Sequence, residues 1–138
     1  MATRYLLDTN ILSDLLKNPQ GNAARKIASL PAVERDSLAT SIVVAAELRY
    51  GAAKSGSPIL AARVVQLLDA VDILPLEPDA DMHYGRIRAE LEKAGTPIGG
   101  NDLLIAAQAI SLGYTIVSDN ESEFTRVVGL RVENWLKT

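Results

Sequence analysis

The sequence predicts an α/β fold, with helices packed on both faces of a mostly parallel sheet of about five short strands. Two observations support this prediction. Short apolar runs of strand character alternate along the chain with longer segments whose apolar residues recur at helical spacing. Acidic residues follow several of the strand-like runs or open the helices. Because parallel sheets bind ligands beyond the carboxyl ends of their strands, these acids indicate where a functional site would lie.

The first half of the chain is expected to begin with a strand and a capped helix. Arg4–Leu7 is a short apolar run that stops at Asp8. Thr9 is suited to cap a helix that ends in the Asn-Pro-Gln-Gly turn at 18–21. The elements expected next are a helix at 22–30, a strand at 37–40, a helix from Ser41 to about Lys54, and a helix that begins at Pro58.

The second half continues the same alternation. Its expected elements are a strand at 72–76, a helix between Pro78 and Gly95, a helix at 102–112, a strand at 115–118 and a short strand at 131–133. The helix at 102–112 is apolar nearly all round, which is typical of a buried helix. On its length, the chain is expected to form one domain over 1–138.

The composition argues against several classes of protein. A net charge of −3 disfavours a protein that binds nucleic acid through a general basic surface, and a single Trp and a single Phe provide little surface for base stacking. The absence of cysteine excludes disulfides and thiolate metal sites. Neither a signal peptide nor an apolar run of membrane-spanning length is evident, so we expect a cytoplasmic protein that does not enter a membrane.

Three acids are candidate metal ligands. Asp8 directly follows the first strand, Glu47 lies on a largely apolar helix face, and Asp102 opens the most hydrophobic helix. Each also has a simpler explanation, because acids are favoured at helix N-termini and a buried Glu can pair with an Arg. Carboxylates that converge raise one another's pKa, and Mg²⁺ and Mn²⁺ prefer oxygen ligands. Taken together, the acids favour metal-dependent phosphate chemistry.

The fourth strand ends in another polar pair, Asp119–Asn120. Either side chain can turn toward the site while the other caps the loop, and the sequence leaves this choice open. The following acids, Glu121 and Glu123, are expected to be solvated loop charges. A lone His83 excludes a histidine-rich zinc site, and the chain has neither a Walker loop nor a dinucleotide-binding glycine motif.

Three spaced motifs resemble a known family. They are Leu-Asp-Thr-Asn at 7–10, Glu-Leu-x-x-Gly at 47–51 and Asn-Asp-Leu-Leu-Ile-Ala-Ala at 101–107. This pattern resembles the PIN-domain ribonucleases, and most closely the VapC toxins of bacterial toxin–antitoxin pairs. The segments 87–99, 124–126 and 128–135 also resemble those toxins, so the similarity covers essentially the whole chain.

The resemblance implies a three-layer α/β/α sandwich that holds Mg²⁺ or Mn²⁺ in an acidic cluster. Asp8 and Asp102 would be the principal metal ligands, with Glu47 as the second acid of the family's set. At the fourth family position, the chain has Asn120 after Ser118, where the family has Asp or Asn after Thr, and Asp119 is the possible substitute. The residues that would support the ligands through hydrogen bonds are Thr9, Asn10 and Ser118.

The implied activity is endoribonucleolytic. A metal-activated water would hydrolyse RNA, often transfer RNA, and leave 5′-phosphate and 3′-hydroxyl ends. The implied partners are a second copy of the chain and a cognate VapB-type antitoxin that inserts a segment into the acidic groove. An acidic protein also needs a local basic track for RNA, and the candidates are Arg25, Lys26, Arg86 and Arg88. The last two also have acids one helical turn away and would equally pair with them.

Two alternatives belong to different classes. The first is a phosphohydrolase of another α/β fold with Asp8 as nucleophile, as in haloacid-dehalogenase-like phosphatases. Those enzymes usually have a second Asp two residues further on, where this chain has Asn10. The second alternative is a PIN-like module that only binds RNA or protein, and the presence of all three acids argues against it.

Overall fold

The computed structural model describes residues 2–137. Its sheet has five parallel strands in the order β3-β2-β1-β4-β5. The strands are β1 (Tyr5–Leu7), β2 (Ala39–Ser41), β3 (Asp72–Leu74), β4 (Thr115–Val117) and β5 (Val132–Glu133). The predicted α/β fold is confirmed, and the sheet is parallel throughout.

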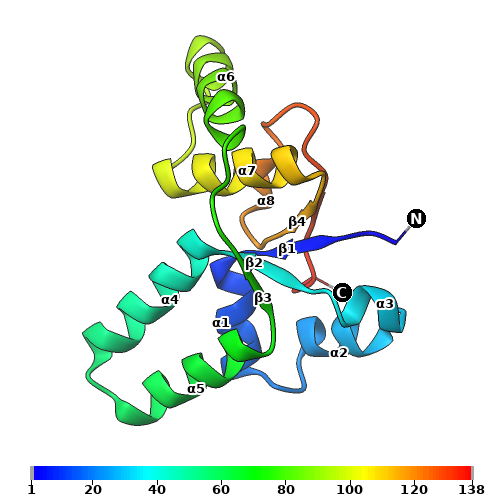
Figure 1. Cartoon of the computed structure of the whole chain (residues 1–138), viewed down its shortest axis with the longest axis vertical. Helices are drawn as coiled ribbons and strands as arrows, with labels where there is room; N and C mark the ends of the chain where they lie inside the picture. Colours follow the sequence, from blue (N-terminus) through cyan, green and yellow to red (C-terminus); the bar gives the residue numbers. More distant parts are fainter. Residues whose placement is uncertain (1, 138) are drawn as a thin grey trace.

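The helices form a layer on each side of this sheet. Helices α1, α2, α4 and α5 lie on one side, and α6 and α7 lie on the other (Figure 1). The helices are α1 (Thr9–Lys17), α2 (Asn22–Ser29), α3 (Ala32–Arg35), α4 (Ile42–Ser55), α5 (Pro58–Asp69), α6 (Ala80–Lys93), α7 (Gly100–Leu112) and α8 (Glu121–Phe124). This arrangement is the three-layer sandwich that the resemblance implied.

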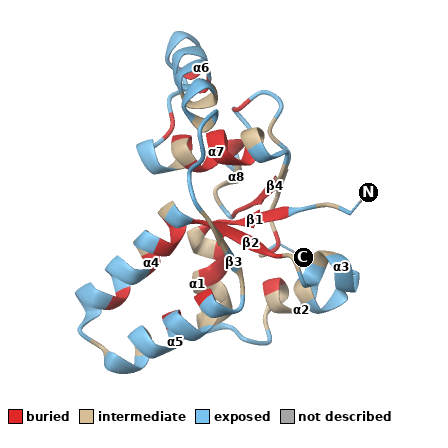
Figure 2. Ribbon diagram, in the orientation of Figure 1, coloured by how far each residue is buried: buried red, intermediate tan, exposed pale blue. Residues whose placement is uncertain are grey.

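The core lies along the central strands and the helices that cover them (Figure 2). Strands β1, β2 and β4 are buried over their whole length, whereas the edge strands β3 and β5 are only partly buried. Such strands are apolar without alternation because helices cover both faces. Helix α7 is buried as predicted, with Ile105 and Ala106 fully enclosed. This core fixes the strand ends that carry the acids.

Three local features differ from the prediction. Asp8, not Thr9, caps α1, since Asp8 is extended and its carboxylate accepts a hydrogen bond from the Thr9 amide at 2.8 Å. Helix α7 begins at Gly100, before Asp102, and so places that acid in its first turn. The four-residue helices α3 and α8 were not predicted, because so short a segment has no helical periodicity.

The topology creates one switch point in the sheet. From β1 the chain proceeds outward to β2 and β3, then crosses to the opposite side of β1 to form β4. Connections therefore leave β1 and β4 in opposite directions, and a crevice opens at their carboxyl ends. Asp8 follows β1 and Ser118 follows β4, so both lie at this crevice.

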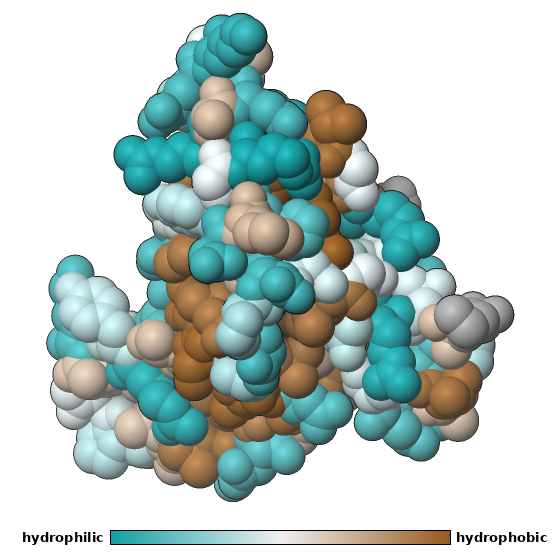
Figure 3. Space-filling view, turned by 45° about the horizontal axis from the view of Figure 1, so that its top comes forward, coloured by the Kyte–Doolittle hydropathy of each residue, from teal (hydrophilic) through white to brown (hydrophobic). Residues whose placement is uncertain are grey.

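One face of the molecule gathers hydrophobic side chains below the polar α6 (Figure 3). Large apolar residues that remain exposed include Ile42 at the start of α4, Val65 of α5 and Leu76 after the edge strand β3. Within residues 2–137, no helix has both the length and the apolar character needed to cross a membrane.

Candidate active site

An acidic pocket of about 430 Å³ lies at the carboxyl edge of the sheet. Its walls come from the ends of β1 and β4 and from the first two turns of α1, α4 and α7. The structure therefore brings together acids that are far apart in the sequence. The residues that line this acidic pocket are Asp8, Thr9, Asn10, Glu47, Asp102, Asp119 and Asn120.

Asp8 is the most buried acid of the pocket, with 4 % of its surface exposed. One carboxylate oxygen accepts the Thr9 amide, and the other accepts the Ser118 hydroxyl at 2.8 Å. Ser118 Oγ in turn accepts the backbone N–H of Asn120 at 2.9 Å and the side-chain amide of Asn10 at 3.3 Å. Burial raises the pKa of Asp8, and its hydrogen bonds from Ser118 and Thr9 oppose that rise. The carboxylate is therefore held in a fixed orientation.

Asp102 lies beside an acid that the sequence analysis assigned to solvent. The Asn120 side chain donates to Asp102 Oδ2 at 2.9 Å and to Glu123 Oε2 at 2.6 Å. Burial, the contact with Glu123 and the charges of Asp8 and Glu123 raise the pKa of Asp102 to about 7. The prediction for Glu123 was therefore wrong. Helix α8 directs the Glu123 side chain toward Asp102 of α7. The position of Glu123 could not be predicted because α8 itself was not predicted.

Glu47 approaches from α4 on the opposite side. Burial raises its pKa, and the negative charge of Asp8 acts in the same direction. The side chain of Thr9, which also lines the pocket, contacts Glu47 and opposes this rise in its pKa. Over residues 2–137, no Lys, Arg or His forms an ion pair with Asp8, Glu47 or Asp102. The simpler explanation of Glu47 as half of a buried ion pair is therefore excluded for the described part of the chain.

The structure distinguishes Asp119 from Asn120. The backbone N–H of Asp119 donates to Asn10 Oδ1 at 2.9 Å, and its exposed carboxylate accepts the Asn134 amide at 3.0 Å. Asn120 instead points its amide at Asp102. Asn120 thus contacts the candidate ligand directly, whereas Asp119 lies at the rim of the pocket. The catalytic roles of both residues remain predictions.

The donor set of the acidic pocket fits Mg²⁺ or Mn²⁺. It offers the carboxylate oxygens of three acids with raised pKa values, and none of these acids pairs with a cation within residues 2–137. Among residues 2–137, no three Asp, Glu or His side chains stand close enough to enclose one ion. That openness suits Mg²⁺, which usually keeps several waters and takes one or two carboxylates. Asp8 and Asp102 would be those two ligands.

The four candidate RNA-binding cations lie outside the acidic pocket. On α6, Arg86 pairs with Glu90 at 3.3 Å and Arg88 pairs with Glu92 at 3.1 Å, as their spacing allowed. Arg25 and Lys26 lie on α2 and line a separate recess beside the C-terminal segment.

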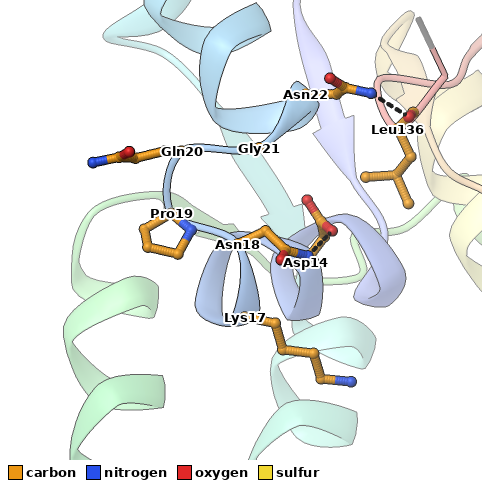
Figure 4. Close-up of a pocket in the computed structure, with 8 residues that line it drawn as sticks. All are labelled: Asp14, Lys17, Asn18, Pro19, Gln20, Gly21, Asn22 and Leu136. Atoms are coloured by element: carbon orange, nitrogen blue, oxygen red, sulfur yellow. Dashed lines mark hydrogen bonds between the residues drawn. The ribbon is translucent and has the colours of Figure 1, made fainter.

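A larger cavity of about 570 Å³ lies where α1 turns into α2 (Figure 4). It contains one acid, Asp14, whose carboxylate accepts the Asn18 amide at 2.8 Å. The Lys17 side chain points away from Asp14. This cavity lacks converging acids, so its size does not make it the candidate active site.

The family assignment follows from comparison with known proteins. The PIN domain family matches residues 5–130. The chain belongs to the PIN-domain family. Ribonuclease VapC2 of Haemophilus influenzae is 40 % identical over 136 residues, which span 96 % of this chain and 98 % of that protein. The tRNA(fMet)-specific endonuclease VapC of Shigella flexneri is 37 % identical over 133 residues, with the same coverage of 96 % and 98 %.

A solved structure supports the same assignment. The chain matches the structure of VapBC2 from Rickettsia felis bound to a DNA fragment from their promoter, with a TM-score of 0.85 and 33 % identity. The match covers 96 % of this chain and 99 % of that one. The resemblance inferred from the three motifs is therefore confirmed for this PIN-domain protein.

Proposed function

We propose that this PIN-domain protein is a VapC-type endoribonuclease that requires Mg²⁺ or Mn²⁺. The observation that carries the proposal is the convergence of Asp8, Glu47 and Asp102 at one crevice, where no cation of residues 2–137 pairs with them. Buried and partly buried carboxylates that lie together are costly unless a ligand supplies positive charge. The names of its ribonuclease relatives support RNA as the substrate.

The residues of the acidic pocket have separable tasks in this chemistry. When bound, the metal ion neutralises the phosphodiester and lowers the pKa of a water molecule. Asp8, whose carboxylate is fixed by Ser118 and the Thr9 amide, would hold the ion together with Asp102 of α7. Glu47 faces the pocket from α4 with a raised pKa, which suits it to accept a proton from the attacking water. The expected products carry 5′-phosphate and 3′-hydroxyl ends.

We further propose transfer RNA as the substrate class. The relative from Shigella flexneri, which is similar over nearly the whole chain, is named for cleavage of tRNA(fMet). Cleavage of such a substrate would inhibit translation and growth. Because transfer RNA is used in the cytoplasm, we propose that the protein acts there.

A cognate antitoxin is the proposed protein partner, since the similar structure from Rickettsia felis is a VapBC complex. A groove of about 570 Å³ between α1, α4 and α5 supports this proposal. It is lined by apolar residues such as Leu16, Leu48 and Leu60, and it also reaches Thr9 and Glu47. A segment laid in this groove would extend to the acids and block them. The exposed apolar residues near β3 support a homodimer.

The decisive experiment is the cleavage of total cellular RNA by antitoxin-free protein. The reaction is run with Mg²⁺, with Mn²⁺ and with chelator, and Asp8→Asn and Asp102→Asn are purified in parallel. Asp72→Asn, which alters an exposed acid on β3, is the matched control. We expect discrete, metal-dependent products from wild type and from the control, and none from the two site variants. Mapping of the product ends then identifies the RNA.

Other outcomes support the alternatives. RNA binding without cleavage at any metal concentration would support a non-catalytic module. Cleavage that persists in both site variants would indicate a contaminating nuclease. Hydrolysis of small phosphate esters alone would support the phosphohydrolase.

A further inference from the structure

We propose that the recess between α2 and the C-terminal segment binds the phosphate backbone of the RNA strand that leads into the acidic pocket. This inference rests on the proposed ribonuclease function and names the surface that positions its substrate. The recess has a volume of about 510 Å³. It is lined by Asn22, Arg25, Lys26, Ser29, Glu133, Asn134, Trp135 and Lys137.

The charge of this basic recess is opposite to that of the acidic pocket. Three cations and one carboxylate line it, so its formal charge is 3 − 1 = +2. The guanidinium of Arg25 donates only to neutral oxygens, those of Gln20 and Asn22. Over residues 2–137, Lys26 forms no ion pair, whereas Lys137 pairs with Glu121. Arg25 and Lys26 therefore provide uncompensated charge in a protein whose net charge is −3.

Hydrogen bonds fix the walls of the basic recess without placing a carboxylate on Arg25 or Lys26. The side chain of Asn22 donates to the carbonyl of Leu136 at 2.9 Å and ties the C-terminal segment to α2 (Figure 4). The indole N–H of Trp135 donates to Glu133 at 2.9 Å. The recess is thus a built feature of the fold, and an anion entering it would meet Arg25 and Lys26.

One hydrogen bond links the basic recess to the acidic pocket. Asn134 lines the basic recess, and its amide donates at 3.0 Å to Asp119, which lines the acidic pocket. A polyanion held in the basic recess would therefore pass this pair on its way to Asp8 and Asp102. The metal ion would neutralise the strand at the cleavage point, and Arg25 and Lys26 would neutralise it beyond that point.

The surface of the basic recess suits phosphates better than bases. Its one aromatic residue, Trp135, is 4 % exposed, and its ring packs edge-on against Tyr5 at 4.9 Å between centroids. No open aromatic face lines the recess for stacking. Contacts to phosphate fix position without reading sequence, so the recess would add affinity for any RNA and leave the choice of target to other contacts.

The test compares two double variants that remove the same charge. Arg25→Gln with Lys26→Gln alters the basic recess, and Arg86→Gln with Arg88→Gln alters α6, where both arginines already pair with Glu. Binding of a labelled single-stranded RNA is measured by fluorescence anisotropy in the Asp102→Asn background, between about 50 and 200 mM salt. Circular dichroism confirms that each variant is folded.

We expect the recess variant to weaken binding about tenfold and to lower the salt slope by roughly 1.4, since each single-strand phosphate contact contributes about 0.7. The α6 variant should stay within about twofold of the parent. With the active site restored, the recess variant should need more RNA for half-maximal cleavage and keep its rate at saturation.

Equal losses in both double variants, or unchanged binding in the recess variant, would overturn the proposal. Unchanged binding would instead indicate that the basic recess binds an acidic segment of a protein partner. If the parent binds RNA but wild type does not cleave it, the proposed function fails while the binding comparison still decides this inference. If the parent binds no RNA, this inference fails, and the cleavage of cellular RNA by wild type decides the proposed function separately.

Discussion

The acidic pocket and the outer face of α6 use the same kinds of charged residue in opposite ways. On α6, Arg86 and Arg88 each meet a Glu four residues further on, and all four side chains are well exposed. In the acidic pocket, Asp8 is buried and Asp102 is partly buried, and neither pairs with a cation within residues 2–137. The arginines of α6 are neutralised by glutamates of the same helix. The carboxylates of the acidic pocket instead need a bound cation to neutralise them.

The two regions should therefore respond very differently to the same chemical change. A substitution in the acidic pocket alters the proposed binding of a divalent cation and relieves carboxylate repulsion. The same kind of substitution on α6 removes a contact that water largely replaces. The predictions below test this difference, beginning with the largest effect.

The first prediction concerns stabilisation by metal. At about 100 times its dissociation constant, Mg²⁺ or Mn²⁺ should raise the free energy of unfolding by about 2.7 kcal/mol, because only the folded state assembles the site. The double variant Asp8→Asn with Asp102→Asn should show no such rise, while Asn at position 8 still caps α1. Thermal unfolding with and without metal measures both values. An equal rise in wild type and variant would place the ion elsewhere.

The second prediction concerns the side chain that orients Asp8. Ser118→Ala removes the hydroxyl that donates to the Asp8 carboxylate and accepts from the backbone N–H of Asn120. Metal affinity should fall about 10–100-fold, as for other groups that hold a ligand in place. Titration calorimetry measures this change. Ser118→Thr, which keeps the hydroxyl, should restore most of the affinity, and a Thr variant as weak as Ala would refute the role of the hydroxyl.

The third prediction concerns pH in the presence of chelator. Asp102 has a pKa of about 7 in the folded protein and an ordinary value of 3.8, so the folded state binds more protons between these values. Wild-type stability should therefore fall as pH rises from about 4 to about 7. The lowered pKa of Glu123, caused by hydrogen bonds from Asp102 and Asn120, acts in the opposite direction, but chiefly below its ordinary value of 4.5.

Asp102→Asn removes the proton uptake of that carboxyl. It should be more stable than wild type at pH 8 by about 1–2 kcal/mol, after allowance for solvent screening, and nearly equal at pH 4. Urea unfolding across this range measures the difference. A gap that does not grow with pH would show that Asp102 is not desolvated as the structure indicates.

The acids of the pocket were predictable because each is tied to an element that the sequence reveals. Asp8 ends an apolar run, and Asp102 opens a helix that is apolar all round, so the parallel sheet places both at one edge. Glu123 was missed because its position depends on α8, which is too short for periodicity. Thr9 was wrongly predicted to cap α1, because Asp8 was considered only as a pocket acid and it also serves as the helix cap.

The basic residues show a different limit of sequence reasoning. Spacing alone indicates that Arg86 and Arg88 can pair along their helix. Nothing local shows that Arg25 and Lys26 face the C-terminal segment, because that contact joins residues more than 100 positions apart, as in the bond from Asn22 to Leu136. Only the packed structure separates the paired cations from the uncompensated ones.

The smallest effect is predicted on α6. Removing the Arg86–Glu90 pair should change the free energy of unfolding by only about 0.2–0.5 kcal/mol in a double-mutant cycle, since both side chains are half-exposed. The order of the pair, with Arg nearer the N-terminus, opposes the helix dipole and favours the lower end of that range. The coupling should vanish at about 1 M salt, where the Debye length is about 3 Å. A coupling energy above about 1 kcal/mol, or one that salt does not reduce, would mean that the Arg86–Glu90 pair is structurally important. The two regions would then differ in how deeply their charges are buried, because the charges on α6 would also contribute strongly to stability.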